Sequence, residues 1–122
     1  MKNKGSKIFS IKLPLLWLFL AIVAVYGSSI NFGLTHLDDK IFIIENKEYN
    51  NKPANIIHSF KRGVFNEDKD TYYRPLLLVS YILEYPVHGQ NPQGYHLVNL
   101  LLHIICTFLI YNLLSILLSN NI

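Results

Sequence analysis

Two long apolar blocks limit what this chain can fold into more than any other feature of its sequence. Residues 13–30 and residues 96–118 contain no formally charged side chain over 18 and 23 positions. A helix of about 20 apolar residues crosses the hydrocarbon core of a bilayer, which is roughly 30 Å thick. Both blocks therefore predict transmembrane helices. A cleaved signal peptide also begins with lysines and an apolar run, but the length of the first block favours a retained span.

All eight acidic residues of the chain lie between the two blocks, in residues 31–95. Only 16% of the chain is charged, whereas an average soluble domain has about 25%. We expect the first part of this segment to be irregular, and the whole segment to be too small and polar for a substantial core. The predicted fold class is an all-α membrane protein, in which two transmembrane helices flank an exoplasmic loop with short interfacial helices.

The distribution of basic residues predicts the orientation of the spans. Four lysines precede the first block with no acid among them: Lys2, Lys4, Lys7 and Lys12. Because basic residues flank the cytoplasmic ends of spans, residues 1–12 and 119–122 are expected in the cytoplasm and residues 31–95 outside. The lysines abut a hydrophobic span, so we interpret them as an orientation signal and expect no nucleic-acid binding. The lipid bilayer is the expected partner, and the inner (plasma) membrane of a bacterium is the expected location.

Residues 75–87 form a third, shorter apolar segment. As a helix this segment is about 20 Å long, and it contains Glu84 and Pro86. It is too short to span comfortably, which favours a re-entrant or interfacial helix over a third span. Four nearby tyrosines suit the headgroup zone: Tyr72, Tyr73, Tyr81 and Tyr85. Residues 56–65 predict another short helix with an apolar face.

Two adjacent carboxylates, Asp38 and Asp39, follow soon after the first span. Such a pair near a membrane surface can accept a proton or bind a hard cation, which makes a divalent cation a candidate cofactor. His36 is a further candidate ligand or proton carrier. The alternative for the two aspartates is a turn or a helix cap.

Arg74 stands immediately before Pro75 and the short apolar segment. A guanidinium group at this position can hold a phosphate through two parallel hydrogen bonds at the level of the lipid headgroups. The alternatives are a side chain that snorkels toward water and a surface ion pair with Asp70.

Polar side chains form a stripe on the second predicted span. His96, Asn99, His103 and Cys106 follow one another at spacings of 3, 4 and 3, which places them on one helical face. A polar stripe inside a membrane faces protein or a water-filled cavity, so we expect further transmembrane helices, of this chain or another, as partners. The two histidines resemble half of a metal site, but hydrogen bonding between helices is the favoured interpretation.

Together these motifs resemble the N-terminal part of a GT-C type membrane glycosyltransferase, in the tetratricopeptide-repeat-associated group related to protein O-mannosyltransferases. Three segments carry the resemblance: Thr35-His36-Leu37-Asp38-Asp39, Tyr73-Arg74-Pro75-Leu76, and the run from Gly94 to His103. The resemblance implies transfer of a sugar from a polyprenyl-phosphate-linked donor to an acceptor at the exoplasmic surface.

The resemblance also implies roles for individual residues. An acidic residue of the first loop, here Asp38 or Asp39, acts as general base toward the acceptor hydroxyl or positions a metal and the donor. Arg74 is the candidate for the lipid phosphate because of its own chemistry and position, and not because of the resemblance. Four residues are expected to be structural or to line the site: His36, His96, Asn99 and His103.

The members of this group are longer than 122 residues and have many more spans. We therefore expect this chain to be an N-terminal fragment with an incomplete active site. The alternatives are a small non-enzymatic membrane subunit or assembly protein, and a fragment of a transporter or channel that uses the polar stripe.

Overall fold

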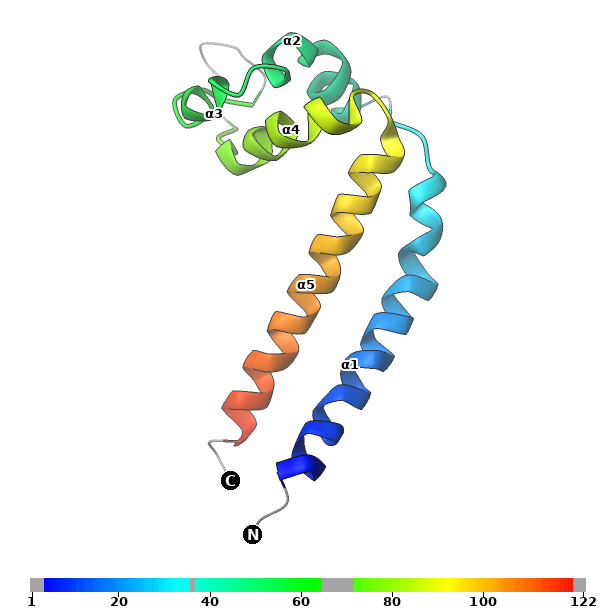
Figure 1. Ribbon diagram of the computed structural model, residues 1–122. Coiled ribbons are helices and arrows are strands. Elements are labelled where there is room, and N and C mark those ends of the chain that lie inside the picture. Colours follow the sequence, from blue (N-terminus) through cyan, green and yellow to red (C-terminus); the bar gives the residue numbers. More distant parts are fainter. Residues whose placement is uncertain (1–3, 36, 65–71, 120–122) are drawn as a thin grey trace. The chain divides into compact units, whose positions relative to one another are not determined.

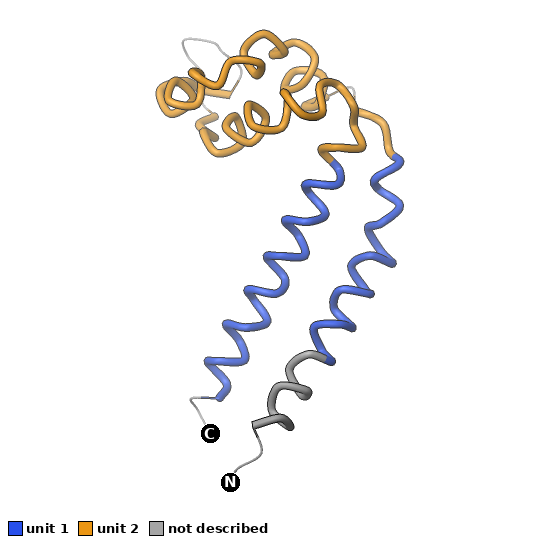
Figure 2. The backbone as a smooth tube through the Cα atoms, in the orientation of Figure 1, with its two compact units in different colours: residues 1–31, 96–122 blue, residues 32–95 orange. Residues whose placement is uncertain are grey.

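The computed structural model describes residues 4–35, 37–64 and 72–119. Every regular element in these residues is a helix, and two of the helices are long and apolar enough to cross a membrane. The predicted all-α class with two candidate spans is thereby confirmed. The chain divides into two compact units: unit 1 comprises residues 1–31 and 96–122, and unit 2 comprises residues 32–95 (Figure 2).

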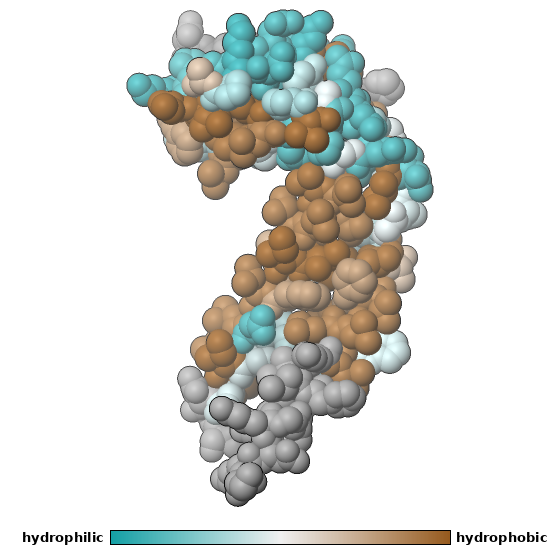
Figure 3. Space-filling view, in the orientation of Figure 1, coloured by the Kyte–Doolittle hydropathy of each residue, from teal (hydrophilic) through white to brown (hydrophobic). Residues whose placement is uncertain are grey.

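Unit 1 consists of the two candidate spans. Helix α1 runs from Lys4 to Tyr26 and continues into the 3-10 turn η1 (Gly27–Asn31), and helix α5 runs from Pro92 to Ser119 (Figure 1). α1 thus begins before residue 13, so part of the predicted cytoplasmic segment 1–12 is also helical. Large apolar side chains of the described residues are exposed along both helices, and the side of the two helices seen in Figure 3 is largely hydrophobic, as a lipid environment requires.

The described residues of unit 2 form four further helical elements besides the start of α5. These are the π-helical turn η2 (Lys40–Glu45), α2 (Lys47–Asn50), α3 (Asn55–His58) and α4 (Pro75–His88). The prediction of an irregular first part is therefore wrong.

The prediction of irregular structure is wrong because the burial of apolar side chains outweighs the local polarity of this segment. Phe42 and Ile43 are 4% and 1% exposed, and burying an apolar side chain of this size contributes about 1.5–3 kcal/mol. The Nδ2 group of Asn50 also donates to the carbonyl of Phe42 at 2.6 Å inside this core. The helix expected at residues 56–65 is shorter than predicted, because α3 ends at His58 and turns follow.

A small core holds unit 2 together, although the sequence predicted no substantial one. Its cluster of buried residues comprises Phe42, Ile43, Val64 and Tyr95, and α4 adds the fully buried Leu78 and Ile82. The buried face of α4 packs against η2, α2 and α3. The core therefore joins segments that are distant in the sequence.

The junction between α4 and α5 is a tight turn. Gly89 has a φ of +57°, a left-handed conformation that glycine adopts without the steric cost that other residues incur, and it ends α4. The hydroxyl of Tyr95, in the first turn of α5, donates to the Gly89 carbonyl at 2.7 Å. The Tyr95 ring also contacts Tyr81 and His88 at centroid distances of 5.8 Å. The first turn of α5 is thus packed onto α4 within unit 2.

Candidate functional site

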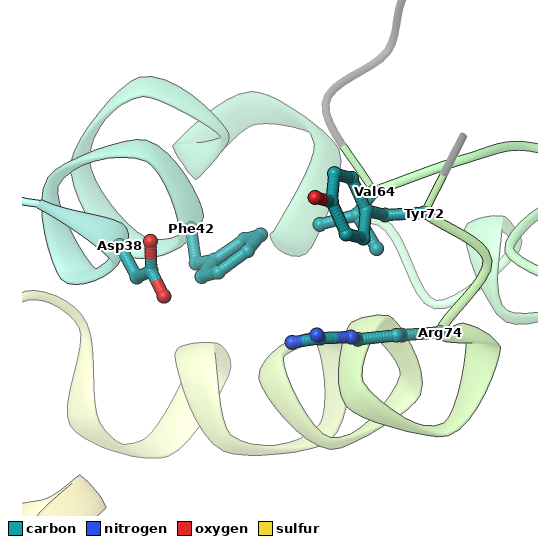
Figure 4. Close-up of a pocket in the computed structure, with 5 residues that line it drawn as sticks. All are labelled: Asp38, Phe42, Val64, Tyr72 and Arg74. Atoms are coloured by element: carbon teal, nitrogen blue, oxygen red, sulfur yellow. The ribbon is translucent and has the colours of Figure 1, made fainter. Parts of the chain in front are cut away.

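A pocket of about 280 Å³ opens in unit 2 between the start of η2 and the start of α4. Five side chains line it: Asp38, Phe42, Val64, Tyr72 and Arg74 (Figure 4). The fold thereby brings together two of the residues that the sequence singled out, Asp38 and Arg74. The carboxylate of Asp38 and the guanidinium of Arg74 extend toward the same space beside the Phe42 ring (Figure 4).

The position of Asp38 follows from the local helical geometry. The backbone turns helical at Asp38, so Phe42, four residues later, lies on the same side of the turn. Phe42 is anchored in the core, whereas Asp38 stays exposed at the pocket. The buried phenylalanine thus fixes which way its neighbour at i−4 faces. Phe42 was not predicted as a site residue, although its spacing from Asp38 was visible in the sequence.

Asp39 lies in a different environment from Asp38. One oxygen, Oδ2, accepts hydrogen bonds from the Thr35 amide at 2.7 Å and from the Thr35 hydroxyl at 2.9 Å. The carboxylate makes no cap hydrogen bond to the helix that follows. Asp39 therefore closes a turn over residues 35–39, which is one of the two alternatives for the aspartate pair. His36 lies outside the described residues.

Arg74 is presented by the start of α4. Its φ of −136° and ψ of 66° lie outside the α-helical region, which a following proline disfavours, and its carbonyl accepts from the amides of Leu77 and Leu78. The guanidinium carbon lies 5.8 Å from the centroid of the Tyr72 ring, within reach of a cation–π interaction. The positive end of the α4 helix dipole adds to the positive potential at this point.

Opposite charges face each other across the pocket without a direct ion pair. Between the described side chains of Asp38 and Arg74 no nitrogen–oxygen distance falls within 4.0 Å. Asp70, the alternative partner for Arg74, lies outside the described residues. The arrangement presents one hydrogen-bond acceptor and one cationic donor to a ligand between them.

Tyr81 packs against the core of unit 2. Its ring stacks on Phe42 at a centroid distance of 5.4 Å, so this tyrosine is not a freely exposed headgroup-zone residue. Burial, followed by the negative charges of Asp39, Glu84 and Asp38, raises the pKa of Tyr81 to about 12. The hydroxyl therefore keeps its proton at neutral pH and remains a hydrogen-bond donor near the aspartates.

Glu84 gives unit 2 a pH dependence that can be measured. Partial burial raises the pKa of its carboxyl group above the ordinary value. The folded state thus holds this proton more tightly than the unfolded state, so the stabilisation is present at acid pH and is lost as the pH rises through the folded pKa. We expect the protection factors for amide hydrogen exchange in unit 2, which are the intrinsic exchange rates divided by the observed ones, to be higher at pH 4.5 than at pH 7. Glu84→Gln should flatten this difference.

A matched control is Glu48→Gln, which makes the same chemical change at an exposed position of α2. It should leave the pH dependence of the wild-type protein intact. A Glu84→Gln variant with the same slope as the wild type would contradict the assignment to Glu84.

The polar stripe of α5 lines a second pocket, in unit 1. This pocket, of about 260 Å³, is lined by Tyr26, Ser29, His96, Asn99, Leu100 and His103. The fold thus brings three predicted residues, His96, Asn99 and His103, to one place, whereas Cys106 is exposed outside it. The ring of Tyr26 meets that of His103 edge-on at 5.1 Å, and Nε2 of His96 is buried without a hydrogen-bond partner among the described residues.

Neither pocket assembles a metal-binding cluster from described residues. In the described part of the chain, no three His, Cys, Asp or Glu side chains gather closely enough to hold an ion. The divalent cation therefore stays a prediction. The two histidines of α5 share their pocket with neutral hydrogen-bonding groups, Asn99, Tyr26 and Ser29.

Comparison with known proteins finds relatives that are named protein O-mannosyl-transferases. The chain is 33% identical to protein O-mannosyl-transferase Tmtc1 of Drosophila melanogaster over 91 residues, which are 71% of this chain. It is 33% identical to Tmtc3 of the same organism over 97 residues, and 46% identical to human TMTC2 over 48 residues. These matches are 75% and 39% of this chain. No family model matches, and no solved structure matches.

The chain spans about a tenth of the length of the two fly relatives and 6% of the human one. These matches and the two apolar helices relate the chain to the TMTC group of O-mannosyltransferases and identify it as a membrane protein. The relatives are animal proteins, so a bacterial location stays a prediction.

Proposed function

We propose that this chain is the N-terminal membrane module of a glycosyltransferase. The module takes part in moving a sugar from a polyprenyl-phosphate-linked donor to an acceptor hydroxyl on the exoplasmic side. The observation that carries the proposal is the pocket in which Asp38 and Arg74 face each other. The similarity to proteins named as O-mannosyltransferases supports the same reaction class.

In this reaction Asp38 acts as general base. Its carboxylate accepts the proton of the acceptor hydroxyl while the acceptor oxygen bonds to the anomeric carbon of the sugar. The bond between that carbon and the phosphate oxygen breaks, and the polyprenyl phosphate leaves with its electron pair. Arg74 stabilises the negative charge on the phosphate through charge-assisted hydrogen bonds. Asp39 is a positioning residue, because its bonds to Thr35 hold the turn that carries Asp38.

The proposal also places unit 2 on the exoplasmic side of the membrane and treats its pocket as one part of a larger active site. The four lysines near the N-terminus support a cytoplasmic N-terminus and an exoplasmic unit 2. The pocket consists of one acid, one cation and an aromatic wall, which is one side of a site for two substrates. Since the chain spans about a tenth of its fly relatives, we assign the remaining walls to further segments and expect the module to be inactive alone.

Substitution of Arg74 tests the function and the phosphate role together. In the full-length protein reconstituted into liposomes with a polyprenyl-phosphate-linked hexose, we expect Arg74→Gln to raise the KM for the donor by about 10- to 100-fold. Loss of charge-assisted hydrogen bonds worth about 1.5–3 kcal/mol predicts this range. Arg74→Lys should retain part of the affinity, because the point charge remains.

Lys61→Gln is the matched control, since it removes an exposed cation of unit 2 that does not line the pocket. It should leave the KM unchanged. An unaltered KM in Arg74→Gln would remove the phosphate role. Absence of any sugar transfer by the full-length wild-type protein from this donor class would contradict the function itself.

The pocket in unit 1 favours a second role, which is the docking of another transmembrane helix. Nε2 of His96 is buried and has no hydrogen-bond partner in the described part of the chain, and the neighbouring Asn99 and His103 need such partners at membrane depth as well. A polar side chain of a further helix, of this chain or another, supplies them. This contact is also the one that a non-enzymatic subunit or assembly protein uses.

A photo-crosslinking amino acid distinguishes a docked helix from lipid. In the purified full-length protein we expect an Asn99 probe to form protein adducts. The control probe replaces Leu101, which is exposed and lies roughly opposite on α5. It should react mainly with lipid. Equal protein adducts at both positions, or none at either, would contradict helix docking at this pocket.

A further inference from the structure

The wall of the pocket in unit 2 is supported by a second aromatic ring. Phe42 lines the pocket and is 4% exposed, so most of its ring lies against other side chains. The ring of Tyr81, from α4, stacks on Phe42 with the centroids 5.4 Å apart and the planes inclined by 21°. Stacked aromatic rings attract each other beyond the burial of their area. Tyr81 therefore holds the Phe42 side chain without lining the pocket itself.

This stack continues to the first turn of α5. The rings of Tyr81 and Tyr95 lie 5.8 Å apart, and Tyr95 is 6% exposed. The Tyr95 hydroxyl donates to the carbonyl of Gly89 at 2.7 Å, so the far end of this side chain is fixed as well. Three rings thus connect the pocket wall with the start of the second candidate span, which runs from Pro92 to Ser119.

The first turn of α5 lies in close contact with the end of α4. Gly94 is buried, and the His88 side chain occupies the space that a Cβ atom at position 94 would need. Glycine permits this approach, because it has no side chain. The His88 ring also meets the Tyr95 ring at 65°, with the centroids 5.8 Å apart. Tyr95 is therefore held on several sides and is a firm support for Tyr81.

The position of Asp38 depends on the Phe42 ring. No described donor forms a hydrogen bond to the Asp38 carboxylate, whereas Asp39 accepts two such bonds from Thr35. The direction of the Asp38 side chain is therefore set by the helical turn that leads to Phe42, four residues later. A shift of the Phe42 ring moves this turn, and the carboxylate moves with it.

We propose that Tyr81 and Tyr95 are positioning residues, through which the first turn of α5 holds Phe42 and Asp38 in place. This inference rests on the proposed function, in which Asp38 is the general base. A displacement of about 1 Å can cost about 10²-fold in rate, so the support of the base matters as well as its chemistry. Because α5 is one continuous helix, helices that pack against it in the full-length protein act on the pocket through this stack.

A double-mutant cycle separates a residue that acts through Asp38 from one that only stabilises the fold. In the full-length protein with a polyprenyl-phosphate-linked hexose in liposomes, we expect Tyr81→Leu to lower kcat by about 10- to 100-fold. The KM for the donor should change less, because Arg74 is retained. In the Asp38→Asn background the same substitution should lower kcat by less than about 2-fold, because the base that Tyr81 positions is already absent.

Two further variants control this cycle. Tyr81→Phe keeps the stacked ring and should restore most of the activity that Tyr81→Leu loses. Tyr85→Leu makes the same change one turn later on α4, in a half-buried ring that packs against the core, and its effect should be equal in both backgrounds. Equal losses for Tyr81→Leu in both backgrounds, or a loss in Tyr81→Phe as large as in Tyr81→Leu, would overturn the proposal.

Tyr95→Phe tests the end of the stack at α5. It removes only the hydrogen bond to Gly89, so we expect kcat to fall by about 2- to 10-fold, again only where Asp38 is present. Full activity in this variant would show that α5 does not hold the stack, and would overturn the proposal. If Tyr81→Leu prevents unit 2 from folding, the cycle between Tyr95→Phe and Asp38→Asn decides alone.

Amide hydrogen exchange without any donor distinguishes failure of this inference from failure of the proposed function. In Tyr81→Leu we expect protection to fall in η2, which carries Phe42, more than at the hydrogen-bonded amides of Ser59 and Lys61 that follow α3. Equal loss in both segments would mean that Tyr81 supports unit 2 as a whole, which would count against positioning. Absence of sugar transfer by the wild-type protein would contradict the proposed function, whereas the exchange result would still report on the stack.

Discussion

Replacing Asp38 with asparagine is expected to lower sugar transfer by the full-length protein by about 10²- to 10⁴-fold, the range that a positioned general base contributes. The amide is nearly the same size as the carboxylate but cannot take the proton of the acceptor hydroxyl. Arg74 is unchanged in this variant and still binds the phosphate of the donor. The substitution should therefore lower kcat more than it raises the KM for the donor. Initial rates at saturating donor and acceptor measure it.

Asp39→Asn is the matched comparison, because it makes the same chemical change one residue away. It weakens the bonds to Thr35 and loosens the turn, so we expect a smaller loss, with the pH profile of the remaining activity unchanged. Thr35→Ala acts on the same contact and should reproduce the direction of that loss. Full activity in Asp38→Asn, or equal losses in both aspartate variants, would show that the division of roles is wrong.

Leu78→Ala is expected to destabilise unit 2 by about 2–5 kcal/mol, the usual cost of truncating a leucine in a core. Leu78 is 1% exposed on the inner side of α4, and a core of this size has little spare stability. Amide hydrogen exchange of unit 2 in detergent micelles, where the spans stay helical, measures the change as lost protection of η2, α2 and α4.

Leu83→Ala provides a control with the same substitution on the same helix. Leu83 is 60% exposed, so its truncation leaves no internal cavity and should change the exchange protection little in micelles. Comparable loss of protection in both variants would mean that α4 does not pack through its Leu78 side.

The candidate spans were predictable from the sequence because a bilayer acts as a solvent. The transfer of residues 96–118 from water into the bilayer depends on their own hydropathy and length. Helix α5 (Pro92–Ser119) matches this block with only short extensions at its ends. The short helix at residues 75–87 was predictable for a similar reason, and Pro75 marks its first position. Helix ends at positions such as Lys4 were less predictable, because several consecutive residues there are compatible with a helix.

The segment around Phe42 shows where local reasoning fails. Its polar surroundings predicted irregular structure, but Phe42 and Ile43 become helical and buried because α4 packs onto them from far along the chain. Local propensity is weak compared with the burial of two large apolar side chains. The pocket wall could not be predicted for the same reason, since Phe42, Val64 and Tyr72 meet only after unit 2 has folded.

The two apolar spans, the polar segment between them and the acidic pair are visible in the amino-acid order alone, because they depend only on which residues follow one another along the chain. Only the tertiary structure separated the two aspartates, which are chemically identical neighbours. Thr35 engages Asp39, whereas the helical turn through Phe42 directs Asp38 toward Arg74. Their different environments arise from contacts between segments, and such contacts are not encoded in either residue alone.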